Sequence, residues 1–321
     1  MNSIALTHMQ HTLEIAPKSP HPTNKIAATI FGVDKKGGNF SLSRTNHWPD
    51  LIFEKIGTTT KIGNSSGTIH AETDCILHSL HATEGASICI TDPFCPNCAK
   101  NMAEAGIKNI YIDKNGFDKD FFRRRGDHFD AMSMQICERA GMNVFAIDLE
   151  NEAITSILEI SNTYNPVEDS PVIVEPIESF SEAVFKEIIA TSTLNNKRRK
   201  FSVALVENKA GKKFGLTVRA HAAIGYTLQK PEEALDLLTP IGKYSFIQEP
   251  VNRLMMHIAR HGYKMADDFL YCSQVPTSRE QVNLVGANIK RITIGDIQKS
   301  RDVQGLKAME QLKTAGILDY S

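Results

Sequence analysis

The strongest constraint on the fold of this chain is an internal repeat, because segments of the second half follow the order of similar segments in the first. NKIAATIFGVDKKGGNFSLSR can be laid beside NKRRKFSVALVENKAGKKFGLTVR, and GASICITDPFCPNCAKNMAEAGIKNIYID beside ADDFLYCSQVPTSREQVNLVGANIKRITIGD. With Ile110 placed on Ile292, the offset is 182 residues. A helix before the first pair and the resemblance of 307–317 to 132–142 complete the set. Four segments matching in one order predict a duplicated chain with a long period.

Each half alternates helical and strand patterns. In the first half, apolar spacing predicts helices over residues 5–16, 70–83, 98–107 and 130–141, and β-branched runs predict strands over 25–34, 86–92, 107–113 and 142–148. This alternation is typical of an α/β protein with a layered sheet. Residues 149–178 are rich in Glu, Asn, Ser and Pro and are predicted to be a linker. The predicted domains are therefore 1–148 and 179–321, joined by that linker.

Composition and charge narrow the class of protein further. Of 321 residues, 41% are hydrophobic and 23% are charged, which is ordinary for a globular chain with a core in each half. The net charge of -1 gives no strong single-sign field to attract long nucleic acids. No run of roughly 18 apolar residues occurs, and the first residues lack the pattern of a signal peptide. We expect a cytoplasmic protein with a small-molecule substrate and no membrane partner.

One pair of cysteines has the spacing of metal ligands. Cys95 and Cys98 stand in DPFCPNCAK, where one helical turn can present both thiolates to a zinc ion. His70, in the sequence HAE, opens another predicted helix and can supply a third ligand. Three protein ligands leave the fourth position for water, and Glu72 can hold that water and move its proton. A redox pair or a purely structural zinc site are the alternatives, and the nearby His-x-Glu argues against both.

His-x-Glu followed by Cys-x-x-Cys is the signature of zinc nucleobase deaminases. Over nearly all of residues 1–148 the chain resembles the cytidine/deoxycytidylate deaminase superfamily, in NKIAATIFGVD, TNHWPD, IHAETDCIL and TDPFCPNCAKNMAEAGIKNIYID. The resemblance implies a three-layer α/β/α fold with a central mixed five-stranded sheet, here duplicated in tandem. The implied site residues are His70, Cys95 and Cys98 for Zn²⁺, Glu72 for catalysis, and Asn46 and Ala71 for substrate binding.

The implied reaction is hydrolytic deamination of a cytosine-type base in a free nucleoside or nucleotide, such as cytidine or dCMP. A zinc-bound hydroxide attacks the carbon that carries the exocyclic amine, and Glu72 passes a proton to the ring and then to ammonia. One alternative is a deaminase of adenine, guanine or a base in RNA. Another is a non-enzymatic zinc-holding scaffold that binds nucleotides, although such a scaffold has no need for the proton shuttle Glu72.

One position departs from the superfamily pattern. Phe94 stands where a proline usually precedes the first cysteine, which leaves the zinc ligands intact but alters the adjoining loop. We expect this change to bear on substrate identity more than on metal binding. A basic run at 123–125 suggests that an arginine there contacts a substrate phosphate, since guanidinium suits phosphate geometry.

The second half lacks this set of ligands. At the offset of 182 residues, Cys95 falls on Thr277 and Cys98 on Glu280. The match to HAE lies somewhere in 248–254, and no register there supplies His-x-Glu. The second half is therefore predicted to keep the fold and lack zinc. This layout resembles that of two-domain bacterial cytidine deaminases, whose inactive domain helps to build the dimer, and implies a homodimer here.

Overall fold

The computed structural model of the protein describes residues 2–119, 129–196, 199–229, 236–240 and 244–321. The chain forms two compact units, and each includes a segment from the other half of the sequence. Unit 1 contains residues 1–47, 70–169 and 222–248, and unit 2 contains residues 48–69, 170–221 and 249–321. The predicted domain boundaries follow the repeat, whereas the compact units exchange two segments, which we call arm 48–69 and arm 222–248.

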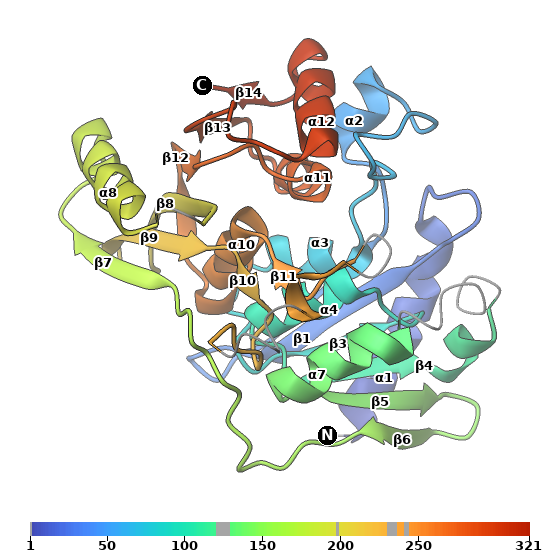
Figure 1. Ribbon diagram of the computed structural model, residues 1–321. Coiled ribbons are helices and arrows are strands. Elements are labelled where there is room, and N and C mark those ends of the chain that lie inside the picture. The colour runs from blue at the N-terminus through green and yellow to red at the C-terminus, as the bar shows by residue number, and fades with distance from the viewer. Residues whose placement is uncertain (1, 120–128, 197–198, 230–235, 241–243) are drawn as a thin grey trace. The chain divides into compact units, whose positions relative to one another are not determined.

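Unit 1 is built on a mixed six-stranded sheet in the order β2-β1-β3-β4-β5-β6 (Figure 1). Its strands are β1 Ala27–Val33, β2 Asn39–Thr45, β3 Ser87–Ile90, β4 Asn109–Asp113, β5 Asn143–Asp148 and β6 Ala153–Leu158. Strand β1 runs antiparallel to both β2 and β3, whereas β3, β4 and β5 run parallel. The carboxyl ends of β3, β4 and β5 therefore meet at one edge of the sheet.

Helices cover both faces of this sheet (Figure 1). Helix α1 (Asn2–Ile15) packs Ala5 and Met9 on the side chains of Phe31, Cys89 and Tyr111. Because side chains alternate along a strand, the neighbouring isoleucines of β3 and β4 point to the opposite face. That face carries α3 (Ala71–Leu77), α4 (Pro96–Glu104) and α7 (Met134–Ala140), which a π-helical turn at Phe129–Ser133 precedes.

Unit 2 repeats this plan in its own six-stranded sheet, ordered β14-β13-β12-β8-β9-β7. Its strands are β7 Ile173–Ile177, β8 Phe201–Glu207, β9 Lys213–Arg219, β12 Lys264–Cys272, β13 Arg291–Ile294 and β14 Asp319–Tyr320. Helix α8 (Glu182–Asn195) buries Phe185 and Ile188 against Phe201 and Tyr271. Helices α10 (Pro250–His261), α11 (Ser278–Gly286) and α12 (Val303–Thr314) also belong to this unit.

The sheet orders confirm the predicted α/β class and are consistent with the predicted tandem duplication. The run β9-β8-β12-β13-β14 repeats the run β2-β1-β3-β4-β5, and each sheet has a sixth strand instead of the expected five. The added strands β6 and β7 both come from 149–178, the stretch predicted to be a linker. Strand β6 pairs with β5, and β7 pairs with β9, each at a sheet edge. Most of their side chains are exposed although both strands contain β-branched residues, as at the edge of a sheet.

Arm 48–69 belongs to unit 2 through polar contacts and a short helix, α2 (Asp50–Lys55), which lies against α11. The Lys55 ammonium donates to the carbonyl oxygen of Gly316 over 2.9 Å, and the Gln311 amide donates to that of Lys61 over 2.9 Å. The remaining short elements are η1 Ala16–Lys18, η2 Lys114–Asp118, β10 His221–Ala222 and β11 Ile247–Gln248. Within the described residues, the structure has no helix of the length and apolarity that crossing a membrane requires.

Candidate metal centre

Two helix starts bring the predicted ligands of unit 1 together. His70 is the extended residue before α3, and Cys95 is the extended residue before α4. Pro96 fits the first position of α4, where its missing N–H would have no partner in any case. Neither His70 nor Cys95 uses its side chain to cap its own helix. Cys98 lies in the first turn of α4, so both thiols face the imidazole from one helix start.

The distances among the three donor atoms fit a tetrahedral zinc ion. The Nδ1 atom of His70 lies 3.2 Å from Sγ of Cys98 and 3.6 Å from Sγ of Cys95, and the two sulfurs are 3.7 Å apart. Zinc–sulfur bonds of about 2.3 Å and a zinc–nitrogen bond of about 2.0 Å place two tetrahedral sulfurs about 3.8 Å apart and sulfur and nitrogen about 3.6 Å apart. All six cysteines are free thiols, so no disulfide competes with this arrangement.

The two thiols of the centre influence one another strongly. The hydrogen bond with Cys98 holds the pKa of Cys95 well below its usual value, and the charge of His70 acts in the same direction. The same contact, together with burial, raises the pKa of Cys98. Metals bind cysteines as thiolates. A cysteine pair in which one thiol ionises readily and the two sulfurs lie close together is therefore suited to bind a metal cation.

Glu72 lies in the first turn of α3, two residues after His70, and is only 4% exposed. Burial raises the pKa of its carboxyl, while the charge of His70 opposes this and that of Cys95 adds to it. Its carboxyl also interacts with Cys98, which places it next to the thiols. A carboxyl whose pKa is raised holds a proton more readily than a free one, which suits a group that must first take a proton and then give it up.

Residues that sequence reasoning missed support the ligand Cys98. The hydroxyl of Thr73 lies 3.9 Å from the sulfur of Cys98 and accepts a hydrogen bond of 3.0 Å from the amide of Asn101. Gln248, from arm 222–248, donates to the side-chain oxygen of Asn101. A signal for this role was present in the repeat, since the offset of 182 places Asn101 on Asn283, another asparagine.

Arm 222–248 also holds helix α4 through a buried lysine. The ammonium of Lys100 donates to the carbonyl oxygens of Ser245 and Ile247, over 2.8 and 2.7 Å. Lys100 is only 4% exposed, and it lies two residues after Cys98 in the sequence. Helix α4, which carries the two candidate cysteine ligands, is therefore fixed in part by residues that come from far along the chain.

The two residues predicted to bind substrate, Asn46 and Ala71, are both buried but have different surroundings. Asn46 is 6% exposed, and its side-chain oxygen accepts hydrogen bonds from Ser19 Oγ and Ile26 N, over 2.7 and 2.9 Å. Its amide donates to the Asn24 carbonyl over 2.8 Å, so Asn46 holds the entry to β1. Ala71 is the fully buried first residue of α3. Substrate contact by either residue stays a prediction.

Phe94, which replaces the usual proline, belongs to an aromatic cluster. It is 2% exposed, and its ring meets that of Phe129 edge-on with centroids 5.3 Å apart. Phe129 meets Phe117 in the same way at 5.9 Å, and Ser133 Oγ donates to the carbonyl of Phe94 over 3.0 Å. The bulk of Phe94 is therefore absorbed by the interior beside the loop. The arginines at 123–125 lie outside the described residues.

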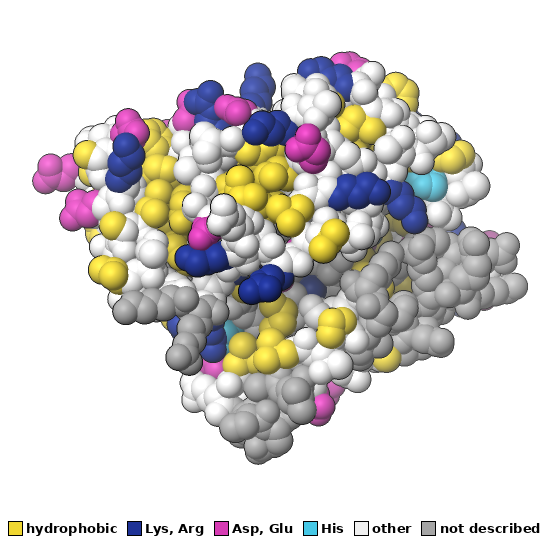
Figure 2. Space-filling model, turned by 45° about the horizontal axis from the view of Figure 1, so that its top comes forward, with side chains coloured by type: hydrophobic (Ala, Val, Ile, Leu, Met, Phe, Trp, Pro, Cys, Tyr) yellow, Lys and Arg dark blue, Asp and Glu magenta, His cyan; other side chains and the backbone are white. Residues whose placement is uncertain are grey.

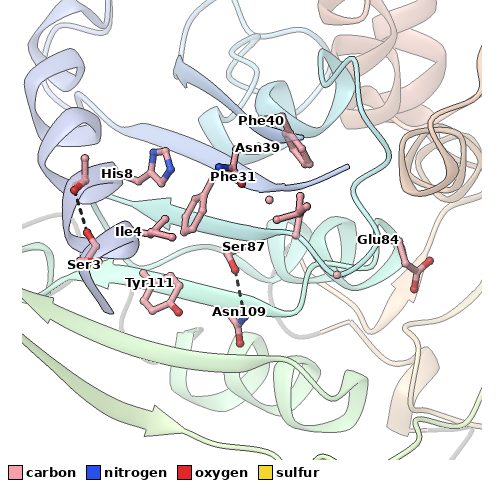
Figure 3. A pocket seen from close by; sticks show the side chains of 15 residues that line it. Ser3, Ile4, His8, Phe31, Asn39, Phe40, Glu84, Ser87, Asn109 and Tyr111 are labelled. Atoms are coloured by element: carbon pink, nitrogen blue, oxygen red, sulfur yellow. Dashed lines mark hydrogen bonds between the residues drawn. The ribbon is translucent and has the colours of Figure 1, made fainter. Parts of the chain in front are cut away.

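Unit 1 also has a cavity of about 580 Å³ between α1 and the sheet (Figure 3). Phe31, Tyr111, Ser87 and Asn109 line it, and the ring of His8 stacks on that of Phe31 at 4.2 Å between centroids. Ser87 and Asn109 begin β3 and β4, whereas the cysteines follow the opposite end of β3. This cavity is thus separate from the metal centre.

Comparisons with known proteins find similarity over part of the chain. No family model matches. A curated protein of Aliivibrio fischeri, named an uncharacterized deaminase in the luxG 3′ region, is 29% identical over 105 residues, which are 33% of this chain and 69% of that protein. Two structures of dCMP deaminase from the cyanophage S-TIM5, apo and with dCMP and dUMP, share 20% identity, have TM-scores of 0.30 and 0.31, and cover 45% of this chain and 98% and 97% of theirs. Part of the chain is thus related to the deaminases, as its resemblance to the cytidine/deoxycytidylate superfamily predicts.

Proposed function

We propose that the protein is a zinc-dependent hydrolytic deaminase acting on a cytosine-type nucleoside or nucleotide. The observation that carries this proposal is the triangle of one nitrogen and two sulfurs from His70, Cys95 and Cys98, with buried Glu72 next to it. A structural zinc site gains nothing from a buried carboxyl with a raised pKa. The curated deaminase that matches part of the chain supports the same class of reaction.

The residues of the site have separate tasks in this proposal. His70, Cys95 and Cys98 would hold the zinc ion through Nδ1 and two Sγ atoms. Bound zinc supplies a Lewis acid and lets water attack at neutral pH. Glu72 takes a proton from the attacking water and delivers it to the ring nitrogen, then carries a second proton to the departing amine. A carbon–oxygen bond forms, a carbon–nitrogen bond breaks, and the products are the uracil analogue and ammonia.

A free nucleoside or nucleotide is favoured over a long nucleic acid by the distribution of charge. On the face that Figure 2 shows, Lys and Arg side chains lie among Asp and Glu side chains. The formal net charge of -1 points the same way, because counterion release at a basic surface drives nucleic-acid binding. A deaminase of adenine, guanine or a base in RNA is the second candidate within the enzymes.

Ammonia release from cytosine, cytidine, CMP, dCMP, adenosine, adenine and guanine tests the proposal, with bound zinc measured on the same samples. We expect release from one cytosine compound. Glu72→Ala should lose at least about 10²-fold in turnover and keep its zinc, because Glu72 moves protons without holding the metal. Glu54→Ala changes an exposed glutamate and is the control, with turnover unchanged.

Full activity of Glu72→Ala would contradict the mechanism. Release from a purine alone would replace the substrate class and leave the reaction type in place. Thermal stabilisation by a nucleotide, with zinc bound and no ammonia released from any compound, would identify a binding scaffold instead.

A further inference from the structure

The first residues of helices α3 and α4 in unit 1 correspond to the first residues of α10 and α11 in unit 2. This correspondence identifies the residues of unit 2 that replace the proposed zinc ligands. Helix α3 packs on β1 and starts after His70, and α10 packs on the matching strand β8 and starts after Glu249. Helix α4 starts after Cys95, and α11 starts after Thr277. The helix start thus settles the register that the sequence left open within 248–254, and it places Glu249 on His70.

A hydrogen bond from an asparagine amide, present at the same place in both units, supports the alignment of Glu249 with His70. In unit 1 the amide of Asn101 donates to Thr73 over 3.0 Å, and in unit 2 the amide of Asn283 donates to Asn252 over 3.0 Å. The acceptor Thr73 lies three residues after His70, as the acceptor Asn252 lies three residues after Glu249. The residues that replace the zinc ligands in unit 2 are therefore Glu249, Thr277 and Glu280.

The strand that leads into the site can be matched in the same way. The backbone N–H of Asn46 donates to the carbonyl of Ile26 over 2.9 Å, and that of Ala220 donates to the carbonyl of Lys200 over 2.8 Å. Both pairs lie at the open end of the hairpin formed by the first two strands of the repeat, β1–β2 and β8–β9. Lys200 therefore replaces Ile26, an apolar residue that directly precedes β1.

The ammonium group of Lys200 forms ion pairs with the carboxylates of Glu249 and Glu280. The Nζ atom of Lys200 lies 3.2 Å from Oε2 of Glu249 and 3.4 Å from Oε2 of Glu280. Only 13% of the Lys200 side chain and none of the Glu280 side chain is exposed. Burial lowers the pKa of Lys200, but the charges of Glu280 and Glu249 outweigh it, so the pKa of Lys200 lies above its ordinary value. The group between the two carboxylates is a cation.

We propose that the Lys200 ammonium is a built-in cation that takes, in unit 2, the place that zinc takes in unit 1. The comparison with zinc rests on the proposed function, whereas the role of the ammonium rests on unit 2 alone. The fully buried carboxylate of Glu280 needs a positive charge, because a buried charge without a partner is strongly destabilising, and the partly exposed carboxylate of Glu249 shares the same cation. A lysine supplies that charge from the chain itself, so unit 2 keeps the frame of the metal site without depending on a metal.

The carboxylate of Glu280 also accepts hydrogen bonds from backbone N–H groups at the starts of α10 and α11. A test of the ion pair should therefore change Glu249 and not Glu280. Its Oε1 accepts from Val251 N over 2.8 Å, and its Oε2 accepts from Thr277 N over 2.7 Å. Glutamine at 280 would lose one of these two acceptors. Glu249 is one-third exposed and bonds Lys200 through one oxygen, so Glu249→Gln removes charge with the least disturbance.

The experiment compares Lys200→Met, Glu249→Gln and the double variant by thermal unfolding and by hydrogen exchange of α10 and α11. Lys200→Met should lower the Tm by on the order of 10 °C and speed exchange at the starts of both helices. The double variant should recover part of both losses, because only one carboxylate, that of Glu280, is then left without a cation. Lys186→Met removes an exposed ion pair with Glu182 in the same unit and should change neither readout.

Unchanged exchange in Lys200→Met, or a double variant no more stable than Lys200→Met, would overturn the proposal. If Lys200→Met does not fold, the double variant decides, since recovery of folded protein supports the built-in cation and continued failure contradicts it. Stripping zinc with a chelator should speed exchange in α3 and α4 and leave α10 and α11 unchanged. Faster exchange of α10 and α11 on stripping would overturn the metal-independence of unit 2, whereas loss of the effect on α3 and α4 would count against the zinc site alone.

Discussion

Asn101 donates a hydrogen bond from its side-chain amide to the hydroxyl of Thr73 over 3.0 Å, and that hydroxyl lies 3.9 Å from the sulfur of Cys98. The same amide contact recurs in unit 2, between Asn283 and Asn252. The same hydrogen bond thus holds α3 against α4 in unit 1 and α10 against α11 in unit 2. It does so although the residues at the starts of these helices differ between the two units. In unit 1 the same contacts reach Cys98, one of the three proposed zinc ligands.

Asn101→Ala should therefore weaken zinc binding by about 10- to 100-fold, the usual effect of losing a group that orients a ligand. Competition with a chromogenic chelator measures this affinity without any substrate. Asn283→Ala removes the matching contact in unit 2 and should leave zinc affinity unchanged. Equal affinities for Asn101→Ala and the unaltered protein would show that Thr73 and Cys98 are held in place by packing alone.

Lys100→Met should loosen arm 222–248 from unit 1. The substitution keeps the apolar stem and removes the ammonium that donates to two partly buried carbonyls, those of Ser245 and Ile247. Each carbonyl left without a partner costs about 1–3 kcal/mol, so the loss is on the order of 2–6 kcal/mol. Hydrogen exchange at 244–248 should become faster than in the unaltered protein. Unchanged protection there would mean that β11 is held by its other contacts.

The α/β class and the cysteine pair were predictable because each depends on residues close together in the sequence, and the repeat was predictable because its segments can be compared with one another. The arms were not predictable, since the partner of Lys55 is Gly316 and local patterns carry no signal for so distant a contact. Strands β6 and β7 were missed because the polar and Pro-containing residues around them indicated a linker, and most of their own side chains are exposed. The position of Glu249 beside Lys200 was not predictable because the sequence left open where α10 begins.

His78 should stabilise unit 1 more at low pH than at high pH. Its Nδ1 lies 2.9 Å from a carboxylate oxygen of Asp74, whose side chain is 1% exposed. The neighbouring Asp74 carboxylate raises the pKa of His78 above that of an unfolded histidine, although burial opposes the shift. The stabilisation is therefore complete below about pH 6.5 and is lost as the pH rises through the folded-state pKa.

His78→Gln should accordingly cost about 1–2 kcal/mol in the free energy of unfolding at pH 6 and less at pH 9. Arg44 and His47 also face Asp74, at 3.7 and 3.8 Å, so the carboxylate keeps positive neighbours in the variant. Denaturant unfolding of both proteins across this range measures the difference. A gap that widens as the pH rises would contradict the assignment of the charge to His78.

His257, on α10 of unit 2, should have the opposite effect on stability, so that unit 2 is less stable at low pH than at neutral pH. Its ring lies 4.4 Å from that of His261 between centroids, and its Nε2 has no hydrogen-bond partner among the described residues. Burial, followed by the charges of His261, Arg260 and Arg253, lowers the pKa of His257 to about 3. An unfolded histidine takes up its proton near pH 6.5, so the unfolded chain gains protons that the folded chain excludes.

Stability from a neutral His257 is thus complete above about pH 6.5 and falls as the pH drops toward the folded-state pKa of about 3. His257→Phe keeps a ring and removes this titration, so its Tm should fall less steeply than that of the unaltered protein between pH 6.5 and 4. His11→Gln changes an exposed histidine on α1 and should leave the slope unaltered. Calorimetry at intervals of half a pH unit resolves the two profiles. Parallel profiles for His257→Phe and the unaltered protein would mean that α10 opens to admit the proton before the unit unfolds.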